Sequence, residues 1–216
     1  MKHRKKNKEA GFSLVELMIA MTITLVLLGL VSTLFARVMG TRQRESRRTD
    51  ALTSAQAALN VMSREIANAG YGLNTNGIIT TDSNAQRLHF RSNIVNNDVT
   101  PTPNRGTFSP GEDLTYFYDS NTDSIVRYDA HGNGENLSSI SVIVNNISKV
   151  TYEYYDYTGS SSTPSAAKTI PTSDTSRIRI TVLVELEKVQ GQPDNQVVKF
   201  ASDVTLRNSE YMLFQY

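Results

Sequence analysis

A run of 20 residues without a charged side chain, residues 17–36, constrains this chain more than any other feature. A helix needs about 20 apolar residues to cross a bilayer core of about 30 Å, so the run has the length of a transmembrane helix. Before it, residues 1–11 carry five Lys and Arg against Glu9, a local charge of +4. Basic residues flank membrane helices on the cytoplasmic side, which predicts a cytoplasmic amino terminus.

A secretory signal peptide is the alternative interpretation of the same segment. Signal peptides have a shorter apolar region of about 7–15 residues and a small-residue cleavage site after it. Here the run is followed by ARVMGTRQRES, which is rich in arginine and lacks an A-x-A site. We therefore expect the segment to be retained.

The arginines at 37–48 weaken the orientation argument. They are interpreted as a solvated helix face, a membrane-surface anchor or a contact with an acidic neighbouring subunit.

Composition excludes several classes of function. The 216 residues contain no Cys and three His, which excludes thiol catalysis, disulfide frameworks and Cys-based metal sites. Beyond residue 11 there are 17 basic and 20 acidic residues, a balance that argues against a nucleic-acid partner. Neither a Gly-rich phosphate loop nor a serine–histidine elbow is present. We expect no catalytic activity and no cofactor.

Glu16 is the second unusual feature of the amino-terminal segment. It lies four residues into the apolar stretch that opens at Phe12. An unpaired carboxylate is costly inside a membrane, so an ionisable residue there marks a functional site by default. The alternative is that Glu16 lies at the level of the lipid headgroups and is solvated.

Residues 8–17, KEAGFSLVEL, closely resemble the type III signal of type IV prepilins and pseudopilins. In that family a membrane peptidase cuts a short basic leader after the glycine and then N-methylates the new amino-terminal phenylalanine. The resemblance therefore implies cleavage between Gly11 and Phe12, and methylation of Phe12. It also implies that Glu16 is the family's fifth-position glutamate. That glutamate is thought to meet the terminal amine of a neighbouring subunit and to set the axial step of the filament.

A long helix should follow the leader (residues 1–11). No proline precedes Pro101, and Gly29 and Gly40 are the only glycines between Phe12 and Ala69, so the helix can continue without a break. Its first half, residues 12–39, is apolar all round, and its second half, residues 40–70, is amphipathic. An apolar stripe at spacings of three or four predicts packing on one side. The stripe comprises Leu52, Ala55, Leu59, Met62, Ile66 and Ala69. Gly70 is expected to end the helix.

Residues 71–216 should form a globular domain of strands. From about residue 78 the apolar residues alternate, which predicts one antiparallel sheet laid on the amphipathic half of the helix, an α+β fold of the type IV pilin kind. The expected strand segments are 88–94, 114–118 with 125–128, 140–144 paired with 150–157, and 178–186 with 197–206. Residues 96–113 and 158–176 are poor in apolar residues, and we expect long mobile loops there.

One further motif resembles a metal site. Residues 119–123, DSNTD, begin like a calcium loop. The sixth position is Ser124 instead of glycine and the twelfth is Ala130 instead of glutamate, so a hairpin turn is the better interpretation.

Aromatic residues and histidines were also considered as candidate sites. Four tyrosines at 152–157 are typical of a strand, and Glu153 and Asp156 between them would repel phosphate. His89 and His131 lack a third metal ligand nearby in sequence, and His3 would leave with the leader. We therefore expect no metal site.

The helix end at residues 62–72 and the segment 201–208 resemble PilW-type minor pilins and J-type pseudopilins. The resemblance implies a minor pilin at or near the filament tip that helps to initiate assembly. Its partners would be the prepilin peptidase, inner-membrane lipid, and other minor and major pilins or pseudopilins bound through the amino-terminal helix. It would cross the bacterial inner membrane once, with a periplasmic domain, before it enters the filament. The alternatives are a type II secretion pseudopilin of the J type and a pilin-tethered adhesin.

Overall fold

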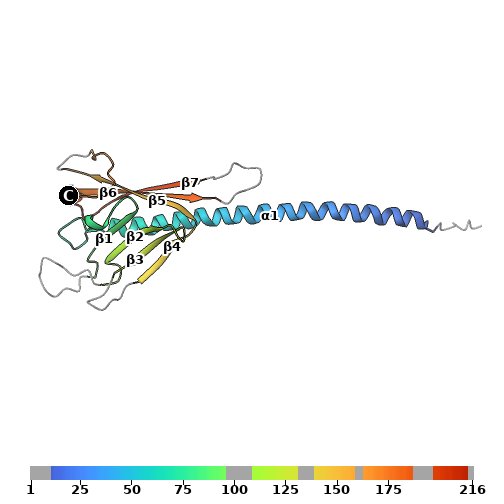
Figure 1. Ribbon diagram of the computed structural model, residues 1–216, viewed down its shortest axis with the longest axis horizontal. Helices are drawn as coiled ribbons and strands as arrows, with labels where there is room; N and C mark the ends of the chain where they lie inside the picture. The colour runs from blue at the N-terminus through green and yellow to red at the C-terminus, as the bar shows by residue number, and fades with distance from the viewer. Residues whose placement is uncertain (1–10, 96–108, 131–138, 159–162, 187–196, 214–216) are drawn as a thin grey trace, which may run out of the picture. The chain divides into compact units, whose positions relative to one another are not determined.

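The computed structural model confirms an α+β fold with one long helix and antiparallel sheets (Figure 1). It describes residues 11–95, 109–130, 139–158, 163–186 and 197–213. The helices are α1 (Leu14–Ala67), the short 3-10 helix η1 (Thr80–Asp82) and α2 (Glu210–Leu213). The strands are β1 (Arg87–Arg91), β2 (Asp113–Asp119), β3 (Ser124–Asp129), β4 (Ser139–Val144), β5 (Ile147–Asp156), β6 (Thr175–Glu185) and β7 (Val197–Thr205).

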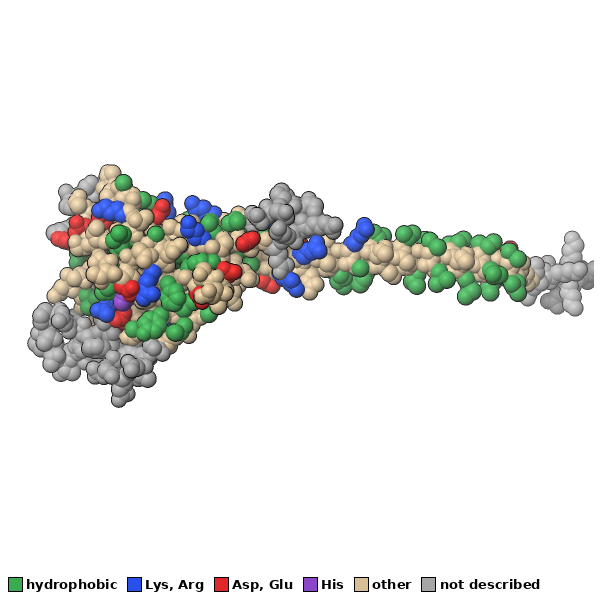
Figure 2. Space-filling model, viewed as in Figure 1, with side chains coloured by type: hydrophobic (Ala, Val, Ile, Leu, Met, Phe, Trp, Pro, Cys, Tyr) green, Lys and Arg blue, Asp and Glu red, His purple; other side chains and the backbone are tan. Residues whose placement is uncertain are grey.

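The chain divides into two units, residues 1–47 and residues 48–216. In the first unit, the large apolar side chains from Leu14 to Met39 are all exposed, and Figure 2 shows apolar side chains along both edges of this part of the helix. This part of α1 is long and apolar enough to cross a membrane, by length and composition. It therefore has the all-round apolar surface that the sequence predicts.

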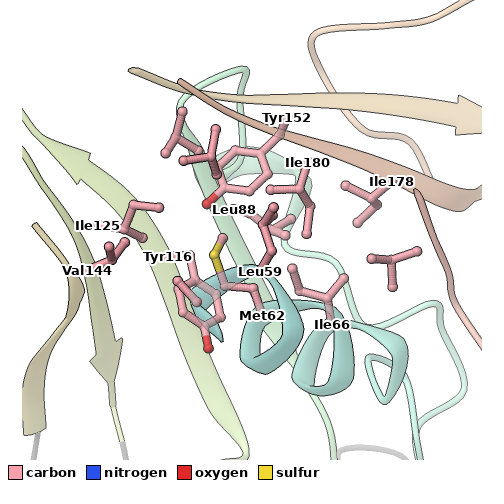
Figure 3. Close-up of a cluster of buried hydrophobic side chains, with 14 of the residues drawn as sticks. Leu59, Met62, Ile66, Leu88, Tyr116, Ile125, Val144, Tyr152, Ile178 and Ile180 are labelled. Atoms are coloured by element: carbon pink, nitrogen blue, oxygen red, sulfur yellow. The ribbon is translucent and has the colours of Figure 1, made fainter. Parts of the chain in front are cut away.

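In the second unit, the predicted apolar stripe of α1 is the centre of the core. Ala55, Met62 and Ile66 are fully buried, as is Ala69 just beyond the end of α1. Leu59 is nearly so, and Leu52 is half-buried against the same cluster. Figure 3 shows this stripe between side chains of two strand groups, with Tyr116 from β2 on one side and Ile180 from β6 on the other. The helix therefore joins the two sheets through one shared core.

The helix α1 ends at Ala67, slightly before the predicted end at Gly70, and Gly70 lies in the turn that follows it. Its φ of +78° lies in the left-handed region, and its N–H donates to the carbonyl of Arg91 at 2.9 Å. A Cβ at this position would lie 2.6 Å from the carbonyl oxygen of Thr75. Both the conformation and the close contact require glycine.

The first sheet has the strand order β1-β2-β3-β4 and the second β5-β6-β7, and every neighbouring pair is antiparallel. The predicted hairpin is the β2–β3 pair. Its turn is held by Asp119 Oδ1, which accepts the Asn121 N–H at 2.9 Å, and by Asp123 with a φ of +46°. The predicted alternation of residues 178–186 is also confirmed, because β6 buries every second side chain.

The sheet arrangement differs from the expectation of one sheet, and the expected pairing of residues 140–144 with 150–157 is wrong. Instead β4 pairs with β3, and β5 pairs with β6. Asn146, between β4 and β5, has a φ of +59°, and the Ile147 N–H donates to the Asp123 carbonyl at 2.9 Å. The chain is thereby turned away from β4 to begin a second sheet. Ile94, expected in the first strand, lies beyond β1 and is 51% exposed.

A polar contact fastens α1 to the first sheet. The Glu65 carboxylate accepts hydrogen bonds from the Tyr116 hydroxyl and from Arg127 Nε, the latter at 3.1 Å. Burial, followed by the charge of Glu65, raises the pKa of Tyr116 well above its ordinary value. The hydroxyl therefore keeps its proton at neutral pH and donates it to Glu65.

The described part of the second expected loop is tied to β5. Lys168 exchanges two backbone hydrogen bonds with Tyr154, both at 2.9 Å. The Asp156 carboxylate accepts from Lys168 Nζ at 2.5 Å and from the Thr175 hydroxyl at 2.8 Å. Residues 96–108 and 159–162, in the expected loops, lie outside the described residues, so their mobility stays a prediction.

We predict that Met62→Ala lowers the free energy of unfolding by about 2–5 kcal/mol, because it leaves a cavity in the shared core. Val61 is the matched control, since it is the next residue on α1 and is 43% exposed. Val61→Ala should change the stability by less than about 0.5 kcal/mol. Denaturant unfolding of the full chains in detergent measures both, and equal losses would contradict this core assignment.

Asp156 should make its contacts sensitive to acid. Burial raises the pKa of Asp156, but the hydrogen bonds from Lys168 and Thr175 outweigh burial and hold the pKa below its ordinary value of 3.8. A depressed folded-state pKa means that the carboxylate stabilises the fold above its ordinary pKa. This stability is lost as the pH falls through the folded-state value.

Asp156→Asn should reproduce the acid effect at neutral pH. Amide hydrogen exchange at Tyr154 and Lys168 should become about tenfold faster, because a charged hydrogen bond is lost. Asp174→Asn is the control, since the Asp174 carboxylate accepts an exposed hydrogen bond from the Ser173 hydroxyl. Unchanged exchange in Asp156→Asn would show that the carboxylate does not hold this segment.

Candidate processing and assembly site

The bond between Gly11 and Phe12 lies just before the start of α1. Residues 11–13 are non-helical and exposed, and Phe12 is 88% exposed. Exposed, non-helical chain ends are where proteases gain access to the backbone. A Cβ placed on Gly11 would meet no atom within 4 Å, so the glycine is not required by packing within the described chain. The geometry leaves this peptide bond open to an enzyme.

Glu16 caps the helix that follows this bond. The Ser13 N–H donates to Glu16 Oε2 at 2.9 Å, and the Leu17 N–H donates to the Ser13 carbonyl at 3.1 Å. A glutamate at the third helical position that reaches back to the capping residue is one half of a capping box, and its charge is favourable at a helix N-terminus. The S-x-x-E spacing at residues 13–16 is the sequence signal for this cap, and it is separate from the charge that makes Glu16 a candidate site.

The cap uses one of the two carboxylate oxygens of Glu16. Among the described residues, Glu16 Oε1 accepts no hydrogen bond, and the side chain is exposed. Glu16 is also the only charged residue from Phe12 to Ala36. The helix thus presents one fixed negative charge on an apolar surface, and the burial of that surface in lipid or among other helices requires a cation for it.

The three threonines of the apolar run are satisfied within the helix itself. The hydroxyls of Thr22, Thr24 and Thr33 donate to backbone carbonyls one turn earlier, at 2.8, 2.7 and 2.8 Å. Internal hydrogen bonding is what an apolar environment demands of such groups. The contrast singles out the Glu16 carboxylate as a group that needs a partner from outside.

His89 is held between two carboxylates, as expected of a satisfied histidine. Nδ1 lies 2.9 Å from Asp82 and Nε2 lies 2.6 Å from Asp113, while Arg91 Nε donates to the second oxygen of Asp113 at 2.8 Å. In the part of the chain that the structure describes, no group of three or more His, Asp or Glu is placed to hold a metal ion. His3 and His131 lie outside the described residues.

Tyr152, Tyr154 and Tyr155 are strand residues of β5, as predicted, whereas Tyr157 follows the end of that strand. Tyr152 and Tyr154 face the core and are fully buried, whereas Arg177 lies over the rings of Tyr155 and Tyr157 at 4.3 and 6.0 Å. Residues 119–123 form the β2–β3 turn rather than an ion loop.

The arginines of α1 between 37 and 47 are exposed. Their exposure is compatible with a solvated helix face, a membrane-surface anchor and a contact with an acidic neighbouring subunit.

A model of the family described as "Prokaryotic N-terminal methylation motif" matches residues 6–32. The matched stretch contains Gly11, Phe12, Glu16 and most of the apolar run. No curated protein and no solved structure matches the chain. The motif implies processing by a prepilin peptidase and assembly with other pilins. Together with the apolar helix and the α+β domain, it supports a type IV pilin or pseudopilin precursor.

Proposed function

We propose that the chain is a minor type IV pilin that enters a filament at or near its tip and helps to start assembly. It is made in a bacterial inner membrane with its amino terminus in the cytoplasm and its domain in the periplasm. Prepilin peptidase cuts it between Gly11 and Phe12 and methylates Phe12. It has no enzymatic activity. The observation that carries the proposal is the single open carboxylate of Glu16 on an uncharged helix, four residues beyond the cleavage bond.

Cleavage supplies the cation that Glu16 needs. It frees an amine on Phe12, which is protonated at neutral pH because an α-amino group has a pKa of about 7.7–8.0. A cation at a helix N-terminus is itself unfavourable, so it also gains from a carboxylate. Glu16 Oε2 is already held by the Ser13 N–H, and Oε1 is free to meet the amine of a neighbouring subunit. Two buried opposite charges offset their desolvation only when they meet, so pairing and filament entry are coupled.

The minor-pilin role is supported by two segments that the fold brings together. The end of α1 and the segment 201–208 are the parts that resemble PilW-type minor pilins. Here the Arg207 N–H donates to the Ala67 carbonyl at 3.1 Å, and Asn208 Nδ2 donates to the Ala69 carbonyl at 3.3 Å. The absence of Cys excludes the carboxy-terminal disulfide loop that is common in major pilins.

A J-type pseudopilin of a type II secretion system shares this processing and charge pairing. It is the second candidate because the same segments of the domain resemble both subunit types. A deletion strain separates them, since loss of a minor pilin abolishes surface pili whereas loss of a pseudopilin abolishes protein secretion. A tethered adhesin would leave both intact and lose attachment alone.

Gly11→Leu should leave the precursor uncleaved. A bulky side chain at the residue before the cut bond blocks the peptidase, although the chain itself has room for it. Gly29→Leu is the matched control, because a Cβ at Gly29 also meets no atom within 4 Å and lies far from the bond. Mass spectrometry of the isolated proteins should find residues 1–11 only in Gly11→Leu. Normal trimming of that variant would count against the site.

Glu16→Ala and Glu16→Gln should be cleaved normally yet reach filaments at about one tenth of the wild-type level or less, since loss of the pair costs more than 1.4 kcal/mol. Ser13→Ala is the control, because the backbone N–H that caps the helix remains. It should assemble like the wild type. Immunoblots of sheared filaments and of membranes measure both pools. Wild-type incorporation of Glu16→Gln would refute the charge pairing.

A further inference from the structure

The two sheets have four outer edges, and the chain covers two of them itself. Beside β1, the Arg91 N–H donates to the Gly77 carbonyl at 2.7 Å, and the Ile79 N–H donates to the His89 carbonyl at 2.9 Å. Segment 77–79 therefore acts as an extra strand. An exposed edge is a template for pairing with another chain, and such covering removes it.

The outer edge of β5 is covered in the same way. The Tyr152 N–H donates to the Ala85 carbonyl at 2.8 Å, and Tyr154 exchanges two hydrogen bonds with Lys168, both at 2.9 Å. Segments from two distant parts of the chain thus occupy this edge. Neither β1 nor β5 is free to bind an incoming strand along its whole length.

The edges of β7 and β4 are open among the described residues, since no backbone hydrogen bond outside the β6–β7 and β3–β4 pairs reaches either strand. The β7 edge carries Lys199 and Asp203, and charged side chains are a common means of blocking edge pairing. In contrast β4, sequence SISVIV, has no charge and no proline. It is the outermost strand of its sheet (Figure 1).

The side chains of β4 are also unusually apolar for an exposed edge. Ile140 is 70% exposed and Val142 is 55% exposed. Val142 lies opposite Val126, which in turn lies opposite Phe117, so an apolar row crosses three strands of the sheet. Val126 is 6% exposed but is not part of the main core cluster. The row therefore forms a second apolar layer that ends, uncovered, at β4.

The chemistry of the edge defines its occupant as an extended strand. Unpaired backbone N–H and C=O groups along one side of β4 are satisfied by another strand, and its side chains would extend the apolar row. No charge on β4 is available to pair with a charged residue placed opposite. The occupant is therefore an uncharged segment with alternating β-branched or other apolar residues.

A second copy of this chain is a poor occupant if the proposed function holds. Antiparallel pairing of two β4 strands relates the copies by a two-fold axis perpendicular to the sheet. Because residues 55–66 of α1 pack on the sheet face, this rotation reverses the helix. Parallel pairing of the two edges instead places the helices on opposite faces of the joined sheet. Subunits that assemble through their amino-terminal helices need these helices parallel and on one side.

We propose that the outer edge of β4 binds an extended, uncharged segment of a different pilin-like subunit, which adds a strand to the first sheet beside β4. This interface rests on the proposed function, because it assumes assembly with other subunits. It acts on the globular domain and is separate from the Glu16 contact. One contact thus makes the chain able to enter a filament, and the other selects which neighbour it takes.

The test is site-specific photo-crosslinking of the full chain in cells that make the filament. Ile140 is replaced by p-benzoylphenylalanine, and Val197, at the β7 edge and 48% exposed, is the matched control position. We expect Ile140 to crosslink to another chain with a cleaved prepilin signal, at an uncharged segment identified by mass spectrometry. Crosslinks confined to this chain or to a second copy, or equal yield from Val197, would overturn the proposal.

Charge substitution provides an independent readout. Ile140→Lys combined with Val142→Lys should reduce crosslinking or copurification of that partner about tenfold, a loss of about 1.4 kcal/mol. The Tm and the leader cleavage should be unchanged, because both side chains are exposed. Ile140→Thr with Val142→Thr keeps the strand propensity and should retain the partner. Binding of the partner by the lysine variant at the wild-type level would overturn the proposal.

The outcomes separate this inference from the proposed function. If Glu16→Gln assembles normally while Ile140 still crosslinks to a pilin-like partner, the charge pairing fails and the β4 interface stands. If Glu16→Gln is excluded from filaments while the lysine variant of β4 keeps its partner, the interface fails and the proposed function stands.

Discussion

In the proposed assembly, the burial of one negative charge decides whether the chain can enter a filament. Glu16 is the only ionised group on a helix surface that is otherwise suited to lipid or to other apolar helices. Within the chain, the carboxylate gains one hydrogen bond from the Ser13 N–H, which is too little to offset its desolvation in an apolar environment. Burial of this carboxylate within lipid or a packed helix bundle therefore calls for a cation from outside the chain.

The second half of the same helix has a different role, because its apolar side chains form part of the core of the domain. Residues from Ala55 to Ile66 form a stripe between two sheets, and Glu65 fastens the helix to Tyr116 and Arg127. In this domain, segments of the chain itself cover the outer edges of β1 and β5, and the charged side chains of β7 discourage pairing at its edge. The uncharged edge of β4 is the exception, and exceptions of this kind are where natural sheets form interfaces.

Local patterns predicted much of the fold. The apolar stripe of α1, the glycine at its end, the β2–β3 hairpin and the alternation of β6 each depend on residues within a few positions of one another. The partner strands of β4 and of β5, which are β3 and β6, were not predictable in this way. Their pairing depends on the left-handed backbone of Asn146 and on a hydrogen bond from Ile147 to Asp123, 24 residues earlier in the chain. Alternation predicts a strand but does not identify its partner.

The sequence alone determined the candidate processing site, because Gly11, Phe12 and Glu16 lie within two helical turns and their spacing does not depend on the rest of the fold. It also determined which half of the long helix packs on the domain, since helical periodicity decides which side chains share a face. Only the tertiary structure decided that the strands form two sheets and that, among the described residues, no backbone partner covers the outer edge of β4. Whether an edge is exposed depends on hydrogen bonds between segments far apart in the chain, and no local pattern records them.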